Sequence, residues 1–290
     1  MRWCERSSKG MIKVLVDSAS SITPEMAQAL GLHLIPLKVA FGEETFLDGV
    51  DLDSPSFYRK LATSRALPIT SQPSAGEFLN RFRELTADGS QVLCVVISHQ
   101  LSGTLSSAEA ARDMLPDRPV HIFNSLSVSI GEGLMAMVAA QMAEAGQPLE
   151  AILARLERMR AQMRIYFVVD TLEFLQRGGR IGGAAALVGT LLKLKPLLTI
   201  QNGRVDAAEK VRTKAKAVER MLALLEQEVG GQTPVYVGLA HGNCAEECAD
   251  LEKAVRARFH CVQALKADAG PIIGTHTGPG VLGVGLCPAD

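Results

Sequence analysis

The sequence has few aromatic residues and almost no net charge. Aromatic residues make up 4% of the 290 residues, with one Trp, and 30 basic residues face 31 acidic ones, which leaves a net charge of -1. Proteins that bind single-stranded nucleic acid need aromatic stacking surfaces, and nucleic-acid-binding domains are usually strongly basic. Attachment to an anionic membrane surface also needs clustered basic residues. The composition therefore argues against nucleic acid or a membrane surface as the partner.

Long apolar runs are missing as well. The longest uncharged stretch, Ala269 to Ala289, is broken by glycines and prolines, whereas a membrane-spanning helix needs ~20 mostly apolar residues. We predict loops around a short strand there and no transmembrane segment. Residues 1–10 carry charges without the apolar core of a signal peptide. We expect a short N-terminal extension, which this composition allows to be disordered, and a cytoplasmic protein with free cysteines.

No cysteines stand at the spacing of a zinc ribbon. Cys244 and Cys248 are four residues apart and follow His241. That spacing places both thiols on one face of a helix, but the sequence offers no second cysteine pair to complete a zinc site. We therefore expect no metal and no other cofactor.

Three catalytic fingerprints are also missing from the sequence. It contains no Walker-type phosphate loop and no Gly-x-Gly-x-x-Gly after the first predicted strand. Ser102 does not stand in the Gly-x-Ser-x-Gly elbow of hydrolases. A triad of Ser102, His276 and Asp17 can still be drawn, so a Ser/His acyl hydrolase that uses Ser102 and His276 stays open as the alternative function.

Apolar runs alternate with helical patterns along the chain, which is typical of an α/β protein. Strand and helix alternate regularly up to about residue 163, which predicts a parallel sheet. Beyond it, Asn202-Gly203 separates two apolar segments and predicts a β-hairpin, hence a mixed sheet. A chain of this length holds about two domains. We predict an N-terminal α/β domain over residues 11–163 and a C-terminal α/β domain over residues 164–290.

Polar side chains cluster in three predicted loops at the ends of elements. They include Thr70, Ser102 and His276. Ser102 follows a predicted strand and precedes a helix, where backbone N–H groups favour an anion. In open α/β sheets, ligands bind at the carboxyl ends of strands. Each hydroxyl taken alone is better explained as a helix cap.

Several short motifs occur in a characteristic order between Met11 and Leu286. They are Val16-Asp17-Ser18, Thr70-Ser71-Gln72-Pro73-Ser74, Leu101-Ser102-Gly103-Thr104, Leu172-Glu173-Phe174-Leu175 running into Arg177-Gly178-Gly179-Arg180-Ile181, and His276-x-Gly278-Pro279-Gly280. Together they make the chain resemble the DegV family of bacterial fatty-acid-binding proteins, which serve fatty acid kinase. One departure is Asn124-Ser125, where family members often carry Asp-Ser.

The resemblance implies a two-domain fold with a long-chain fatty acid, such as palmitate, buried between the domains. It implies that Thr70, Ser102 and His276 bind the carboxylate, with Arg180 nearby. It also implies that the chain is no enzyme itself: a separate fatty acid kinase subunit phosphorylates the bound fatty acid to an acyl phosphate, and Arg212 helps to dock that kinase.

Two further patterns bear on this reading. Basic residues recur at every second position from Lys210 through Arg212 and Lys214 to Lys216, so they share one face only if the segment stays extended, and not if Thr213 begins a helix. The small-residue stretches Gly183–Gly189 and Met135–Ala140 are candidates for the tunnel lining, with ordinary helix packing as the alternative.

Overall fold

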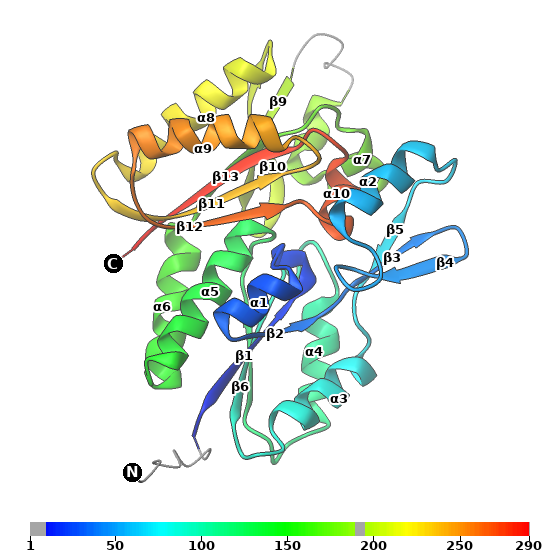
Figure 1. Ribbon diagram of the computed structural model, residues 1–290, viewed down its shortest axis with the longest axis vertical. Coiled ribbons are helices and arrows are strands. Elements are labelled where there is room, and N and C mark those ends of the chain that lie inside the picture. Colours follow the sequence, from blue (N-terminus) through cyan, green and yellow to red (C-terminus); the bar gives the residue numbers. More distant parts are fainter. Residues whose placement is uncertain (1–9, 189–194, 290) are drawn as a thin grey trace.

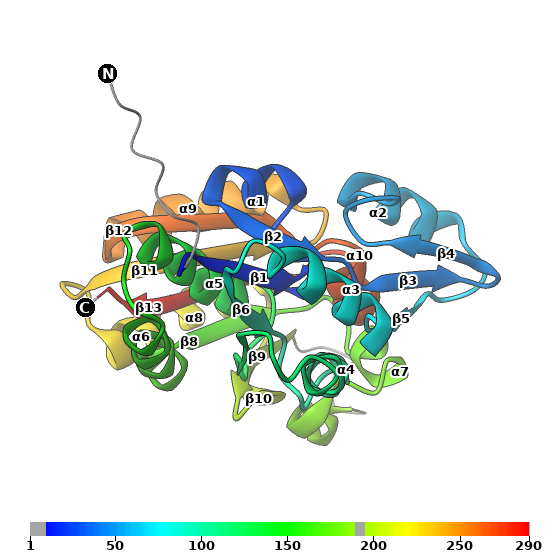
Figure 2. The same ribbon diagram turned by 90° about the horizontal axis from the view of Figure 1, so that it is seen from below.

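The computed structural model describes residues 10–188 and 195–289, and its strands form three sheets. The predicted extension, apart from Gly10, lies outside these ranges. Figures 1 and 2 show two large sheets with helices around and between them, and a third small sheet at one side. The prediction of an α/β fold with a parallel sheet followed by a mixed sheet is confirmed.

The first sheet has four parallel strands in the order β2-β1-β6-β7. They are β1 (Ile12–Asp17), β2 (Leu32–Ile35), β6 (Gln91–Val96) and β7 (Val120–Asn124). Alternate side chains of a strand point to opposite faces. Leu15 and Cys94 pack against α3 (Ala75–Leu85) and α4 (Thr104–Asp113), whereas Val14 and Leu93 face α1 (Pro24–Leu30), α5 (Ile130–Glu144) and α6 (Leu149–Gln162).

The second sheet has six strands in the order β10-β9-β8-β13-β11-β12, of which only the β11–β12 pair is parallel. Its strands are β8 (Arg164–Val168), β9 (Lys195–Gln201), β10 (Arg204–Val211), β11 (Pro234–His241), β12 (His260–Asp268) and β13 (Leu282–Pro288). The turn of the predicted hairpin joins β9 to β10, and Asn202 and Gly203 both have the positive φ that such a turn requires. The helices α8 (Lys214–Val229) and α9 (Ala245–Arg258) cover the outer face (Figure 1).

The helix α5 lies between the two large sheets (Figure 1). Every residue from Ile130 to Ala140 is buried. The helix packs on β1 on one side and on β11, β12 and β13 on the other. A helix that is apolar all round is stable only when protein covers it on every side, so α5 joins the two sheets into one core.

The third sheet was not predicted. It consists of β3 (Lys38–Phe41), β4 (Glu44–Leu47) and β5 (Ile69–Ser71), and it projects to one side beside α2 (Ser54–Thr63) (Figure 2). Its strands have only three or four residues, too few for a clear periodic pattern. The η1 turn (Ser18–Ser20) connects β1 to α1.

The prediction of loops around a short strand for Ala269 to Ala289 is wrong. Pro271–Thr277 form the helix α10, with Pro271 in its first turn, and β13 is a full strand between β8 and β11. The glycines that suggested loops serve packing instead: a Cβ at Gly283 would come within 3.1 Å of Phe167 Cβ. Figure 1 shows α10 beside α2 and α7 (Glu173–Arg177). The η2 helix (Gly182–Leu187) follows α7.

Two carboxyl groups are buried where α5 meets β1. Asp17 accepts hydrogen bonds from the N–H groups of Ala19, at 2.9 Å, and of Ile97, at 2.8 Å. Burial raises the pKa of Asp17 to about 6. Burial and the neighbouring Asp17 raise the pKa of Glu132 well above its ordinary value. We infer that Glu132 keeps its proton at neutral pH, because two adjacent buried carboxylates repel each other.

Replacement of Glu132 by Gln is therefore expected to stabilise the protein progressively as the pH rises. The unfolded chain loses the Glu132 proton near pH 4.5 while the folded chain retains it, so the wild type loses up to about 1.4 kcal/mol of unfolding free energy per pH unit above that value. A glutamine side chain at this position does not titrate. Urea denaturation of both proteins between about pH 5 and about pH 8 measures the difference. Parallel stability curves, like those expected for the exposed control Glu43→Gln, would contradict the assignment.

Candidate functional site

A cavity lies between the two large sheets. We call it the central cavity; its empty volume is about 960 Å³, part of which is open to solvent. Leu37, Ile97 and Leu101 line it from the first half of the chain, and Phe167 and Ile273 from the second. Most of the wall is apolar, and the polar groups occupy few positions. This combination is typical of a binding site for an apolar molecule with a polar end.

Small residues on the second sheet make room for the central cavity. Gly283 of β13 and Ala240 of β11 are neighbours in the sheet and both line the cavity. Ala269 follows β12 and lies beside them on the wall. Ile130 at the start of α5 also lines the cavity, whereas Ala136–Ala140 pack in the core between the sheets. Of the two alternatives for Met135–Ala140, ordinary packing therefore fits better than tunnel lining. Ala184 and Leu187 also pack in a core cluster, and Gly189 lies outside the described residues.

The four predicted ligand-binding residues all line the central cavity. Thr70 lies on β5, Ser102 lies between β6 and α4, His276 is on α10, and Arg180 follows α7. Thr70 Oγ1 and His276 Nε2 are 2.8 Å apart, although the two residues are 206 positions apart in the sequence. Ser71 and Gln72 add further polar side chains to the wall, as do Ser129 and Thr277. The sequence marks the motif to which Ser71 and Gln72 belong, but it indicates no role for these two side chains.

Hydrogen bonds hold Ser102 and Arg180 in place. Ser102 Oγ is 2.8 Å from Thr104 Oγ1, at the start of α4. The Arg180 guanidinium donates to the carbonyl of Leu101 at 3.1 Å and to that of Gly178 at 2.7 Å. Leu101 precedes Ser102 in the chain, so the first contact ties the arginine to the loop of the serine. Arg180 thus brings a positive charge to the polar part of the cavity.

His276 is electrically neutral in this site. Burial, followed by the charge of Arg180, lowers the pKa of His276 to about 4. Its Nδ1 has no hydrogen-bond partner among the described residues. If Nε2 carries the proton and donates to Thr70, the threonine hydroxyl is free to donate to a ligand. The cluster therefore offers hydroxyl donors and one positive charge to an anionic group.

Gly178 makes the position of His276 possible. A Cβ at residue 178 would come within 2.2 Å of His276 Nδ1, closer than any packing allows. Gly178 also directly follows α7, which ends at Arg177. Its role beside His276 could not be predicted, because it depends on a residue almost a hundred positions away.

The geometry does not form a hydrolase triad. His276 Nε2 contacts Thr70, and Ser102 Oγ contacts Thr104. Asp17 is engaged by the backbone of Ala19 and Ile97. A serine nucleophile needs a base within hydrogen-bond reach and a third group that orients this base. Neither contact is present among the described residues.

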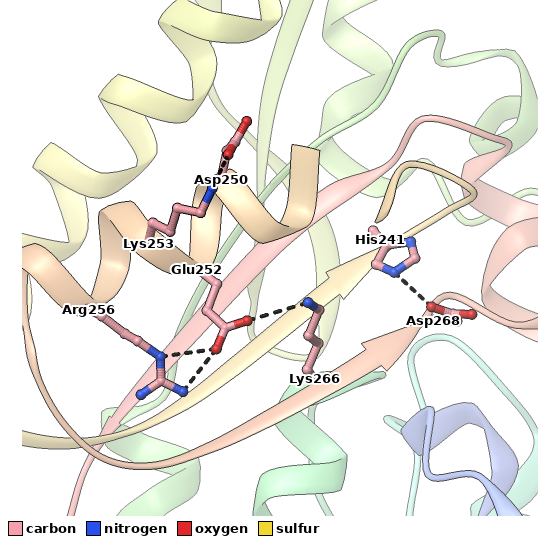
Figure 3. A network of polar contacts seen from close by, with 7 residues as sticks. All are labelled: His241, Asp250, Glu252, Lys253, Arg256, Lys266 and Asp268. Carbon is pink, nitrogen blue, oxygen red and sulfur yellow. Dashed lines mark hydrogen bonds and ion pairs between the residues drawn. The ribbon is translucent and has the colours of Figure 1, made fainter. Parts of the chain in front are cut away.

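His241, Cys244 and Cys248 have separate partners. His241 Nε2 lies 2.7 Å from Asp268 Oδ1, as Figure 3 shows. Cys244 Sγ is 3.3 Å from the carbonyl of Val281, and Cys248, on α9, is buried in the core of the second sheet. Within residues 10–188 and 195–289, no group of three His, Cys, Asp or Glu side chains could hold a metal ion. No helix in these ranges is both long and apolar enough to cross a membrane.

Arg212 lies apart from the wall of the central cavity. It is exposed between β10 and α8. Thr213 caps α8 by accepting a hydrogen bond from the N–H of Lys216, so the alternating basic residues do not share one extended face. Lys214 pairs with Glu247 at 2.7 Å.

Asn124 and Ser125 shape the loop after β7. Asn124 Nδ2 lies 2.8 Å from His99 Nδ1, and Asn124 Oδ1 accepts from the N–H of Leu126. Ser125 is buried and donates to the carbonyl of Ser127. These contacts explain why short polar side chains occupy the loop.

Comparisons with known proteins agree over nearly the whole chain. Residues 11–289 match the family model described as "Uncharacterised protein, DegV family COG1307". Protein DegV of Bacillus subtilis (strain 168) is 38% identical over 277 residues, which cover 95% of this chain and 99% of that protein. A structure on fatty acid binding of a DegV family protein from Thermus thermophilus has a TM-score of 0.91 at 36% identity and covers 96% of this chain and 99% of its own. A stearic acid-binding protein from Eubacterium ventriosum has a TM-score of 0.87 at 26% identity, with coverage of 96% and 98%.

The neutral state of His276 is testable by NMR. We expect the ring protons of His276 to titrate with a midpoint near 4, well below the ordinary value of 6.5. Arg180→Ala is expected to raise the midpoint, because it removes a neighbouring positive charge, but not to restore 6.5, because burial is the larger cause. A wild-type midpoint at the ordinary value would show that the ring is solvated and that this description of the cluster is wrong.

Proposed function

This chain belongs to the DegV family, and from that premise we propose that it binds a long-chain fatty acid, such as palmitate, in the central cavity. The observation that carries the proposal is the pairing of an apolar wall with the polar cluster of Thr70, Ser102, Arg180 and His276. Solved relatives are described as fatty-acid-binding proteins. The ligand would lie between the proposed domains, residues 11–163 and 164–290.

The energetics of this cavity favour an acyl chain. Burial of about 14 methylenes stabilises a complex by roughly 11 kcal/mol before the cost of ordering the chain. The carboxylate must then be hydrogen-bonded, because an unpartnered buried charge is costly. The hydroxyls of Thr70 and Ser102 and the guanidinium of Arg180 supply donors for it, and His276 orients Thr70.

We propose further that the chain performs no chemistry on the fatty acid itself. A separate kinase subunit would phosphorylate the bound carboxylate to an acyl phosphate, and the chain would hold the substrate and the product. The absence of a serine–histidine contact among the described residues supports a binding role over hydrolysis. Because such a kinase takes its nucleotide from the cytoplasm, the proposal places the chain there too. Arg212, exposed at the start of α8, is the proposed docking residue.

Replacement of Ser102 by Ala is expected to weaken palmitate binding about 10- to 100-fold, because a hydrogen bond to a charged group contributes ~1.5–3 kcal/mol. Titration of the delipidated protein with palmitate measures the loss, and thermal unfolding confirms that the variant folds. Ser106→Ala is the matched control, since Ser106 is exposed on α4, the helix that follows Ser102. Equal affinity of wild type and Ser102→Ala would remove Ser102 from the site. Steady hydrolysis of an acyl ester by the wild type, lost in Ser102→Ala, would favour the enzyme instead.

Replacement of Arg212 by Ala is expected to leave palmitate binding intact and to reduce phosphorylation by the kinase subunit. Removal of one desolvated arginine from an interface costs ~2 kcal/mol or more. Arg212→Lys is expected to restore the rate only in part, because lysine lacks the planar fork. Arg258→Ala, an exposed arginine at the end of α9, is the control. If Arg212→Ala is phosphorylated like the wild type at every kinase concentration, Arg212 does not dock the kinase.

A further inference from the structure

Asp17 is a fully buried acid that is not among the residues lining the central cavity. It is the last residue of β1, whose neighbour in the sheet is β6. The parallel register pairs Val16 with Val95, and β6 ends one residue later at Val96. The two strands therefore end side by side, and the chain that leaves β6 passes the Asp17 side chain.

The carboxylate of Asp17 accepts from a backbone N–H group just past the end of the β1–β6 ladder. Ile97 follows β6, and its N–H donates to Asp17 Oδ2 at 2.8 Å. The other oxygen, Oδ1, accepts from the N–H of Ala19 at 2.9 Å, within the η1 turn. Ile97 is buried and lines the central cavity. Because a buried N–H without an acceptor is costly, Asp17 fixes the point at which the chain leaves the sheet.

The loop that starts at Ile97 leads directly to Ser102. The carbonyl of Ser98 accepts from the N–H of Leu101 at 2.9 Å and from that of Ser102 at 3.1 Å. These two hydrogen bonds to one carbonyl close the loop into a tight turn. The segment that Asp17 anchors therefore carries Ser102 with it.

Two further anchors hold Ser98, the residue after Ile97. Ser98 Oγ donates to the carbonyl of Gly203, in the turn between β9 and β10, at 2.7 Å. The Ser98 N–H donates to the carbonyl of Ser127 at 2.9 Å. The loop is thus attached to three separate parts of the fold. We expect the loss of one anchor to shift the loop rather than to unfold the protein.

We propose that Asp17 is a positioning residue, which holds the N–H of Ile97 and thereby places the Ser102 hydroxyl against the fatty acid carboxylate. The proposal rests on the proposed fatty acid binding and adds to it a residue that does not touch the ligand. Hydrogen bonds weaken steeply as the donor turns away from the acceptor, so a small rotation of the loop reduces the contribution of Ser102. Thr70 lies on a different element, β5, and keeps its place.

Asp17→Asn separates the two hydrogen bonds of the carboxylate. Asparagine begins a helical turn as well as aspartate does, so its oxygen is expected to keep the N–H of Ala19. Its amide nitrogen then faces the N–H of Ile97, and two donors form no hydrogen bond. We expect Asp17→Asn to bind palmitate roughly 3- to 10-fold more weakly than the wild type, measured by titration of the delipidated proteins. Removal of a negative charge alone would favour an anionic ligand, so a weaker affinity reports the lost hydrogen bond.

Asp17→Ala removes both acceptors and is the second variant, with an expected loss at least as large. Thermal unfolding confirms that each variant folds. Asp88→Asn is the matched control, because the Asp88 carboxylate accepts from the N–H of Ser90, at 3.0 Å, just before the other end of β6. Its palmitate affinity is expected to equal that of the wild type.

Double variants show whether Asp17 acts through Ser102. In a Ser102→Ala background, Asp17→Asn is expected to cause no further loss, because the hydroxyl that it positions is already absent. In a Thr70→Ala background it is expected to cause its full loss. A general loosening of the cavity would lower the affinity equally in both backgrounds.

The outcomes separate the two proposals. A loss in Asp17→Asn that disappears in the Ser102→Ala background and persists in the Thr70→Ala background supports the positioning role. Equal losses in both backgrounds, or wild-type affinity in both Asp17 variants, overturn it, while fatty acid binding itself stands. If the wild type binds no palmitate, the proposed function fails, and the positioning role fails with it.

Discussion

The burial of α5 between two sheets is the constraint on which the rest of the structure depends. Its residues Ile130 to Ala140 are covered on every side, so neither sheet can move away without exposing apolar surface at ~25 cal/mol per Å². The same helix begins at the central cavity, where Ile130 forms part of the wall. The packing that joins the two halves therefore also fixes the space between them.

The polar cluster depends on that fixed arrangement, because its members come from both halves of the chain. Thr70 belongs to a strand of three residues, and His276 to a helix of seven. Neither element is long enough to be stable by itself in water. Their position is set by the packing of α10 against α2, α7 and the third sheet, and Gly178 leaves the space that the imidazole needs. A shift of any of these elements would change the 2.8 Å distance between Thr70 Oγ1 and His276 Nε2.

The sequence allowed prediction where the signals are local. The Asn202-Gly203 turn involves two adjacent residues, and the predicted turn is present. β13 was underestimated because glycine lowers strand propensity, whereas Gly283 and Gly285 fit the close neighbours that surround them there. The polar residues of the site were found as motifs. Their pairing was not, because no local pattern links positions 206 residues apart.

The charge of the polar cluster fits the proposed function, in which a bound carboxylate is held and is then phosphorylated. Two buried arginines would bind a carboxylate tightly, but they would also withdraw electron density from both of its oxygens. Here the imidazole is neutral, since burial and Arg180 lower the pKa of His276 to about 4. The cation, Arg180, is exposed and already donates to two backbone carbonyls. In the proposed complex the hydroxyl donors would carry much of the recognition, and the carboxylate would keep a lone pair for the proposed attack on phosphorus. The same weak charge limits the affinity that the head group contributes, and the apolar wall has to supply the rest.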